Sequence, residues 1–389
     1  MLPPTREYGL KALANFLPRA GLGYASERNF SEATPGAVSR LSPYLQRRLL
    51  QEGEVARAAV AMHGFPAAEK FTQEVLWRTY WKGWLEQKPF VWTAYRNFPR
   101  QQSAELAKAE KGNTGIPCFD TWVEELRSTG YLHNHARMWF ASIWIFTLGL
   151  PWQWGADFFW RELLDRDAAS NTLSWRWVAG LQTKGKHYLA TEENIAKFTR
   201  GRFSHTPGLR NGRAVPWDGL PEQSIEPLPT FAPLPQGDLA LVIHGDDLSL
   251  ELSEIATRPV RRIVVLSEAW CPASALVQAW SRAALEDAAA RAEAHFGVRV
   301  EWLEPGKENA PAALAQFGAD LPLIQAAPFV GPWKDLGWPA FSFRRAHDSL
   351  LFPHAQKGFF SFRSQIIPYL QTAGVNEEKG NLNPRFSPC

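Results

Sequence analysis

Residues 131–177 read YLHNHARMWFASIWIFTLGLPWQWGADFFWRELLDRDAASNTLSWRW and carry the strongest signal in this chain of 389 residues. Seven of the 18 tryptophans lie in this stretch, and 12 lie between Trp77 and Trp177. Tryptophan usually scatters singly through cores, so this density suits a redox protein that passes electrons between indoles. Between the tryptophans lie an Asn/Arg/Met cluster, two aspartates and an asparagine. These polar residues suggest that the stretch has a function beyond packing.

The chain on either side of this stretch divides into two kinds of pattern. Before residue 205, apolar residues recur at helical spacing, in segments 67–87, 120–129, 131–149, 155–165 and 191–199. Seven prolines between His205 and Gly237 indicate a linker. Short β-rich runs follow at 239–245, 261–268, 298–304 and 321–327, with an Ala-rich helical stretch between the second and the third. We therefore predict a multidomain α and α/β protein, with an all-helical domain at 1–205, a linker at 206–237 and a parallel-sheet α/β domain at 238–389.

Composition describes an ordinary globular protein, with 45% apolar and 21% charged residues. The longest apolar run, around 141–150, is too short to span a bilayer, and the N-terminal residues lack a secretory signal pattern. Cys118, Cys271 and Cys389 are too few and too scattered for a disulfide framework or a zinc site. We expect a reduced, cytoplasmic protein that does not enter the membrane.

Charge is distributed unevenly along the chain. Residues 1–205 hold 26 Lys and Arg against 19 Asp and Glu, whereas residues 206–389 hold 16 against 20. Only the first half therefore has the charge to meet a polyanion such as a nucleic acid. An excess of this size is also ordinary for 205 residues, so charge alone leaves both interpretations open.

Two serines three residues apart occur in Ser39-Arg40-Leu41-Ser42, directly before Pro43. Proline is favoured at the first position of a helix, and hydroxyls with free backbone N–H groups at a helix N-terminus can seat a phosphate. The plainer interpretation is a simple helix cap.

Glu74, Trp77 and Arg78 fall at i, i+3 and i+4, so they lie near one face of the predicted helix. They either line a binding pocket or form a solvated Glu–Arg pair beside a core tryptophan.

A second polar set lies within the tryptophan-rich stretch. Asn134 and Arg137 share a helix face beside Met138, and Asp165 and Asp167 end the next predicted helix. Two acids opposite an arginine form either a buried ion pair that also binds a heteroaromatic ring or a site for a divalent ion. No further ligands stand at suitable spacing, and two histidines two residues apart diverge on a helix, so we expect no metal.

In combination these motifs resemble the helical FAD-binding domain of the DNA photolyases and cryptochromes, from about Tyr24 to Trp177. The resemblance rests on SRLSPYL, ExxWR, TGxPxxD at 114–120, HNxxRM and DxDxASN followed by WxW, all in order.

The resemblance implies FAD as cofactor and assigns residues to it. Ser39 and Ser42, with Arg40 and Leu41 between them, would hold the FAD phosphates, and Tyr24 would help. Arg78 would line the cofactor pocket. The ring of polar groups around the isoalloxazine would be formed by Asn134, Arg137, Asp165 and Asp167, with Arg137 paired to Asp165. Asn171 would lie next to flavin N5.

The resemblance also assigns electron-transfer and substrate residues. Trp175 would lie nearest the flavin, Trp152 in the middle and Trp92 at the surface end of a tryptophan chain. Glu74, Trp77 and Met138 would line the pocket for a flipped pyrimidine dimer. The (6-4) branch would have His at 134 and 138, so Asn134 and Met138 resemble the cyclobutane-dimer branch.

The implied function is that of a deoxyribodipyrimidine photolyase, a lyase that repairs cyclobutane pyrimidine dimers in DNA under blue light. The alternative is a cryptochrome-like photoreceptor without repair activity. Retention of the dimer-contacting residues favours repair, with single-stranded DNA as a candidate substrate. The family's N-terminal α/β antenna domain is expected to be absent, with an α/β domain after the flavin domain instead, so no antenna chromophore is assigned.

Overall fold

The computed structural model describes residues 2–377, apart from 32–35, 184–185, 207, 211, 213–214, 217, 221–223, 305 and 307–308. Before residue 205 it contains the helices α1 (Arg6–Phe16), α2 (Leu22–Glu27), α3 (Ser42–Gln46), α4 (Glu52–His63), α5 (Phe65–Glu86), α6 (Pro89–Arg96), α7 (Ala104–Lys111), α8 (Pro117–Thr129), α9 (Asn134–Ser142), α10 (Trp152–Glu162), α11 (Ala168–Val178) and α12 (Glu192–Phe198). Within the described residues no strand precedes residue 239, which confirms the helical character predicted for this part.

After residue 237 the chain forms a five-stranded, fully parallel sheet. Its strands are β1 (Leu239–Ile243), β2 (Val260–Leu266), β3 (Val300–Leu303), β4 (Leu323–Ala326) and β5 (Phe341–Phe343), in the order β3-β2-β1-β4-β5. The helices of this part are α13 (Ala275–Phe296), α14 (Ala310–Phe317), α15 (Pro332–Leu336), α16 (Ala346–Leu351), α17 (Phe359–Arg363) and α18 (Ile366–Glu377). The predicted parallel α/β class is confirmed, although the three residues of β5 were too few to produce a sequence signal. Among the described helices none is both long and apolar enough to cross a membrane.

Local chemistry fixes the helix ends that surround the tryptophan-rich stretch. The single helix predicted for 131–149 begins only at Asn134, where the His133 ring accepts a hydrogen bond from the backbone N–H of His135, and continues as a π-helical turn over Ile143–Thr147. Helix α11 begins directly after Asp167, whose carboxylate accepts the backbone N–H of Ser170 at 3.0 Å. An acidic cap of this kind satisfies a free N–H of the first turn and suits the positive end of the helix dipole.

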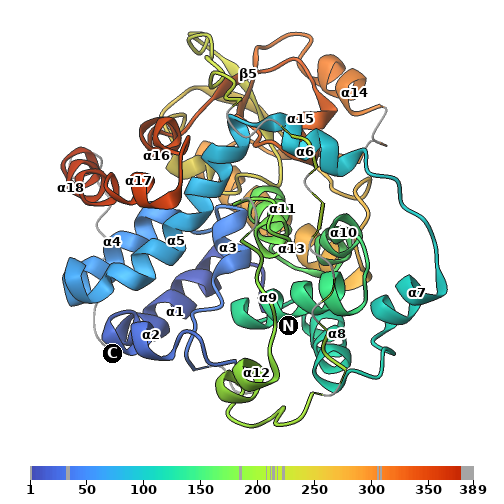
Figure 1. Cartoon of the computed structure of the whole chain (residues 1–389). Helices are drawn as coiled ribbons and strands as arrows, with labels where there is room; N and C mark the ends of the chain where they lie inside the picture. The colour runs from blue at the N-terminus through green and yellow to red at the C-terminus, as the bar shows by residue number, and fades with distance from the viewer. Residues whose placement is uncertain are drawn as a thin grey trace.

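The C-terminal helices pack against the first half of the chain. Figure 1 shows α16, α17 and α18, in red, beside the blue helices α4 and α5. Phe359 and Phe362 of α17 join Tyr80 of α5 in one buried cluster. At the opposite end of the chain, the Trp280 indole of α13 donates a hydrogen bond to the carbonyl of Leu2 at 2.7 Å. The segments before and after the predicted linker therefore share apolar contacts.

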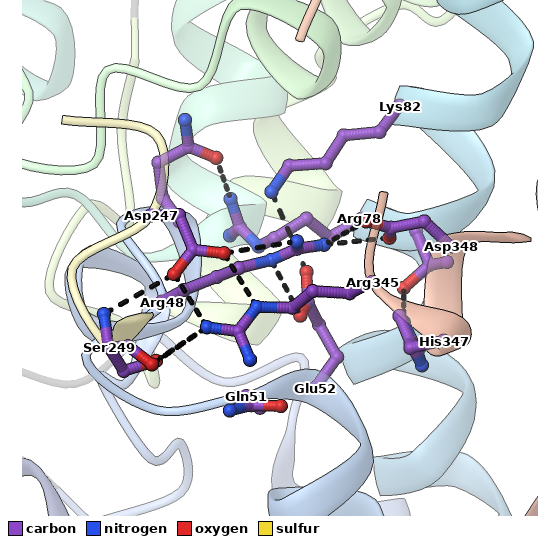
Figure 2. Close-up of polar contacts among 12 residues, drawn as sticks. Arg48, Gln51, Glu52, Arg78, Lys82, Asp247, Ser249, Arg345, His347 and Asp348 are labelled. Carbon is purple, nitrogen blue, oxygen red and sulfur yellow. Dashed lines mark hydrogen bonds and ion pairs between the residues drawn. The ribbon is translucent and has the colours of Figure 1, made fainter. Parts of the chain in front are cut away.

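A buried ionic network also joins the two halves (Figure 2). Arg48 forms a bidentate pair with Asp348 at 2.7 and 2.8 Å and lies 3.5 Å from Asp247. Arg345 in turn forms a bidentate pair with Asp247 at 2.6 and 2.8 Å. All four side chains are buried, so each charge depends on its partner: removing one would leave another unpaired in a low-dielectric interior.

Candidate functional site

One cavity of about 590 Å³ lies among α2, α3, α5, α9 and α11. Small-molecule sites typically enclose about 300–1,000 Å³, so this cavity has the size of a cofactor or substrate site. Its lining includes every residue that the sequence assigned to the cofactor: Tyr24, Ser39, Arg40, Leu41, Ser42, Arg78, Asn134, Arg137, Asp165, Asp167 and Asn171. It also includes Glu74, Trp77, Met138 and Trp175.

Two ion pairs lie along the wall of this cavity. Arg137 donates to Asp165 at 2.9 Å, as predicted, and Arg78 pairs with Asp167. Burial by itself would raise the pKa of the Asp165 carboxyl, but Arg137 and Arg78 lower that pKa below its usual value. Asp165 is therefore ionised at neutral pH and offers an acceptor that bulk water scarcely reaches.

The serine motif does not act as a simple helix cap. The capping position of α3 is Leu41, and no side chain makes a capping hydrogen bond there. Ser39 Oγ instead accepts the backbone N–H of Leu41 at 3.4 Å. Arg40 has a left-handed backbone with φ of 56°, and its guanidinium lies 4.4 Å from the centre of the Tyr131 ring. Ser39, Arg40 and Ser42 all line the cavity, so a cation and two hydroxyl-bearing residues are available there to a phosphate.

Glu74 lines the cavity, as one interpretation of its motif predicts, but the Glu74–Arg78 pair of the other interpretation does not form. Its carboxylate accepts a hydrogen bond at 2.5 Å from Arg28 of the segment after α2, rather than from its helix neighbour Arg78. Burial raises the pKa of Glu74, and Arg28 acts in the opposite direction. Sequence reasoning missed Arg28, because 46 residues separate it from Glu74 and no local pattern links the two.

Trp77 is held in place from the far end of the chain. Its ring stacks on Phe359 of α17, with the ring centres 3.7 Å apart and the planes 9° from parallel. Trp77 also lines the cavity, so α17 supports one of its apolar walls. Phe359 gave no sequence signal, because nothing in the pattern of residues 346–377 points toward the helical half.

The three tryptophans of the predicted electron-transfer chain are placed unequally. Trp175 lines the cavity and packs edge-on against the buried Trp144, with the ring centres 6.2 Å apart. Trp152 stacks at 5.6 Å on Tyr95, which contacts Trp92 at 5.4 Å. The surface position expected for Trp92 is wrong: it is 3% exposed, and its indole donates to Asp335 at 2.9 Å, because α15 lies over α6.

The residues present suit FAD. An isoalloxazine ring offers both donors and acceptors along one edge, and the cavity wall provides guanidinium, carboxylate and amide groups to match it. The Trp175 ring also lines the cavity and offers it an aromatic surface. Asn171 is fixed by a 2.8 Å hydrogen bond from its side-chain amide to the carbonyl of Ala156. Trp177 also lines the cavity and was not assigned to a site from the sequence.

Metal-binding side chains do not gather in the described part of the chain, where no group of three His, Cys, Asp or Glu could hold an ion. The two histidines of the HNxxRM motif make other contacts. His135 Nδ1 lies 2.8 Å from the carbonyl of Asn29, and burial lowers the pKa of His133 to about 4. His133 is therefore neutral at pH 7.

Comparison with known proteins agrees with this geometry. Residues 71–200 match the family model described as the FAD binding domain of DNA photolyase. The deoxyribodipyrimidine photo-lyase of Thermus thermophilus is 34% identical over 192 residues, which are 48% of this chain and 45% of that protein. Cryptochrome-1 of Arabidopsis thaliana is 28% identical over 302 residues, 72% of this chain and 42% of that protein.

Among solved structures, a bacterial class III photolyase from Agrobacterium tumefaciens is similar at 28% identity, with a TM-score of 0.44, over 50% of this chain and 42% of that one. The chain spans less than half the length of the curated relatives given above. FAD is the cofactor named for the matched domain, and the cavity contains the groups to bind it. Residues 71–200 are therefore similar in sequence to the FAD-binding domain of DNA photolyases, and photolyases and cryptochromes are both among the relatives.

Proposed function

We propose that this protein repairs cyclobutane pyrimidine dimers in DNA under blue light, with FAD as its cofactor. The observation that carries the proposal is that Glu74, Trp77 and Met138 line the same cavity as the polar groups assigned to FAD. A substrate in contact with these three side chains would therefore share one enclosed space with the cofactor. The similarity to the deoxyribodipyrimidine photo-lyase of Thermus thermophilus supports the same reaction class.

When bound, FAD would supply light-driven transfer of a single electron to the dimer and recover it after the ring splits. The chain's own residues bind and orient the substrate. Trp77 and Met138 offer apolar surface to the two linked pyrimidines of a dimer that has left the helical stack. Glu74, anchored by Arg28, is placed to hydrogen-bond a base edge. Because burial raises its pKa, Glu74 takes up a proton more readily than an exposed carboxyl, which suits it to donate as well as to accept.

Electron supply to the cofactor is the proposed role of the buried aromatic residues. Trp175 lines the cavity, and Trp152, Tyr95 and Trp92 form a second group of ring contacts behind it. The ring contacts support Tyr95 as a member of the series between Trp152 and Trp92. Phosphate contacts by basic side chains of the helical half would supply most of the DNA affinity, which should fall steeply with salt. A preference for single-stranded DNA is not included, because no observation supports it.

Repair of a dimer-containing oligonucleotide under blue light, by protein with its flavin reduced, tests the proposal. Glu74→Gln should lower the repair rate about 10-fold or more, since a hydrogen bond to a charged or partly charged group contributes about 1.5–3 kcal/mol. Glu69→Gln is the matched control: Glu69 lies on the same helix, pairs with Arg363 and does not line the cavity, so its repair rate should equal wild type. Bound flavin without repair by the wild-type protein would contradict the proposal.

A cryptochrome-like photoreceptor is the second candidate. The alignment with Cryptochrome-1 of Arabidopsis thaliana covers 72% of this chain and so extends beyond the residues matched by the FAD-binding model. In addition, α17 of the C-terminal part reaches the cavity wall through the stack of Phe359 on Trp77. Light-driven flavin reduction in a protein that shows no repair, with a change in protease sensitivity of α16–α18, would favour this function.

A further inference from the structure

Lys82 is a buried cation behind the candidate cofactor site. It lies on α5 one turn beyond Arg78, and only 2% of it is exposed (Figure 2). Its Nζ has no hydrogen-bond partner among the described residues: the nearest carboxylate oxygen, of Glu52, is 3.6 Å away, and the Phe329 ring centre is 4.1 Å away. A buried ammonium without hydrogen bonds is costly, so the site requires another partner.

A second, small cavity adjoins Lys82. Its volume is about 30 Å³, and Lys82, Asp165, Asp167 and Asp246 are among its lining residues. Asp165 and Asp167 line the larger cavity as well, so these two carboxylates belong to the wall between the two spaces. About 10–15 Å³ of such space accommodates one water molecule, so one or two waters fit here. Such waters would complete the hydrogen bonds of Lys82 Nζ.

The network in Figure 2 supplies Lys82 with a buried carboxylate partner, Glu52, whose oxygen lies 3.6 Å from Nζ. Burial by itself would raise the pKa of Glu52, but Lys82 and Arg48 lower it to about 2, so Glu52 is ionised. Arg48 is itself held by Asp348 at 2.7 Å, so the pair of Arg48 with Glu52 keeps the Glu52 carboxylate beside Lys82. Burial lowers the pKa of Lys82, and Glu52 opposes that shift. Lys82 therefore lies opposite an ionised carboxylate and shares the lining of the small cavity with Asp165 and Asp167.

We propose that Lys82 is a positioning residue for the FAD site. It acts through Asp165, Asp167 and water bound in the small cavity, and it raises the reduction potential of the flavin. A fixed positive charge in a poorly solvated interior favours an added electron nearby, because little solvent screens the interaction. The inference rests on FAD binding, which the proposed function shares, and is independent of DNA repair.

The test measures the midpoint potential of flavin bound to the full-length protein. Lys82→Met should lower the midpoint potential of the flavin by at least about 30 mV. For a two-electron couple this corresponds to a roughly tenfold change in the ratio of reduced to oxidised flavin, toward the oxidised form. Lys82→Arg keeps the charge and should remain near wild type. Lys88→Met is the matched control, because Lys88 is also buried, at 3% exposed, and lines neither cavity.

Each outcome decides between the alternatives. If Lys82→Met does not retain flavin, Lys82→Gln, neutral but still polar, provides the measurement. A wild-type potential in the neutral variants overturns the inference, as does an equal shift in Lys88→Met. An ordered water within hydrogen-bond distance of Lys82 Nζ in a crystal structure supports the bridge, whereas a dry cavity refutes it. Wild-type protein without flavin would instead refute the FAD assignment, whatever Lys82 does.

Discussion

Gly155→Ala adds one methyl group where α10 packs against the tryptophan of the cavity wall. A Cβ at this position would lie 2.3 Å from Trp175 Cη2 and 3.0 Å from Trp144 Nε1. Carbon atoms in contact prefer about 3.5–4.0 Å, so the Trp175 ring must shift by roughly 1 Å. The ring is 2% exposed and is packed against Phe159, which leaves it little room to move.

Overpacking of this kind costs about 1–3 kcal/mol, and alanine recovers about 0.5–1 kcal/mol relative to glycine within a helix. We therefore expect Gly155→Ala to lower the free energy of unfolding by about 1–2 kcal/mol, measured as a fall in Tm of a few degrees by circular dichroism. Photoreduction of bound flavin should slow in parallel, because the displaced indole lines the cavity and is the one proposed to pass electrons to the flavin. In Gly23→Ala, the matched control, the new methyl in α2 meets no atom within 4 Å, so stability should hold or rise. A Gly155→Ala protein with unchanged Tm and unchanged photoreduction would show that Trp175 is not confined as described.

Two further outcomes are expected. Trp175→Phe should slow the photoreduction of oxidised flavin, followed by absorbance under blue light, while the amount of bound flavin stays near wild type; an unchanged rate would remove Trp175 from the electron path. Glu268 pairs with Arg47 at 2.6 Å and with Arg166 at 3.5 Å. Burial opposes its ionisation, but the two arginines lower its pKa to about 2. Because this pKa lies below the unfolded value, the carboxylate stabilises the protein above about pH 4.5, and that stability is lost as pH falls toward 2. Glu268→Gln should therefore lose about 3–5 kcal/mol at pH 7 and flatten the acid limb of a Tm-against-pH curve, since it leaves two buried arginines short of a partner; an acid limb identical to wild type would argue against this role.

Much of the candidate site could be predicted because its residues occur in short motifs with fixed spacing. A helix places i, i+3 and i+4 on one face, so Glu74, Trp77 and Arg78 had to emerge together. Asp165 and Asp167 lie in the short connection between α10 and α11, and Asp167 caps α11 by accepting the backbone N–H of Ser170 three residues later. The parallel sheet was equally accessible, because its buried strands form continuous apolar runs between helical segments.

Other features depend on contacts that no local pattern encodes. The family resemblance placed Trp92 at the surface end of the tryptophan chain. No local pattern indicates that α15 covers it, because Asp335, the residue of α15 that Trp92 contacts, is 243 positions away in the sequence. The partner of Glu74 was missed for the same reason, as was the stack of Phe359 on Trp77.

The sequence by itself determined which side chains line the candidate cofactor cavity, because their spacing follows from helix geometry and helix capping. Only the tertiary structure decided what stands behind them. Lys82 reads from the sequence as an ordinary helix lysine, and it becomes a buried charge because the loop after β4, with Phe329, closes over α5. Burial depends on segments far apart in the chain, and burial turns an ordinary charge into one strong enough to act on a neighbouring site.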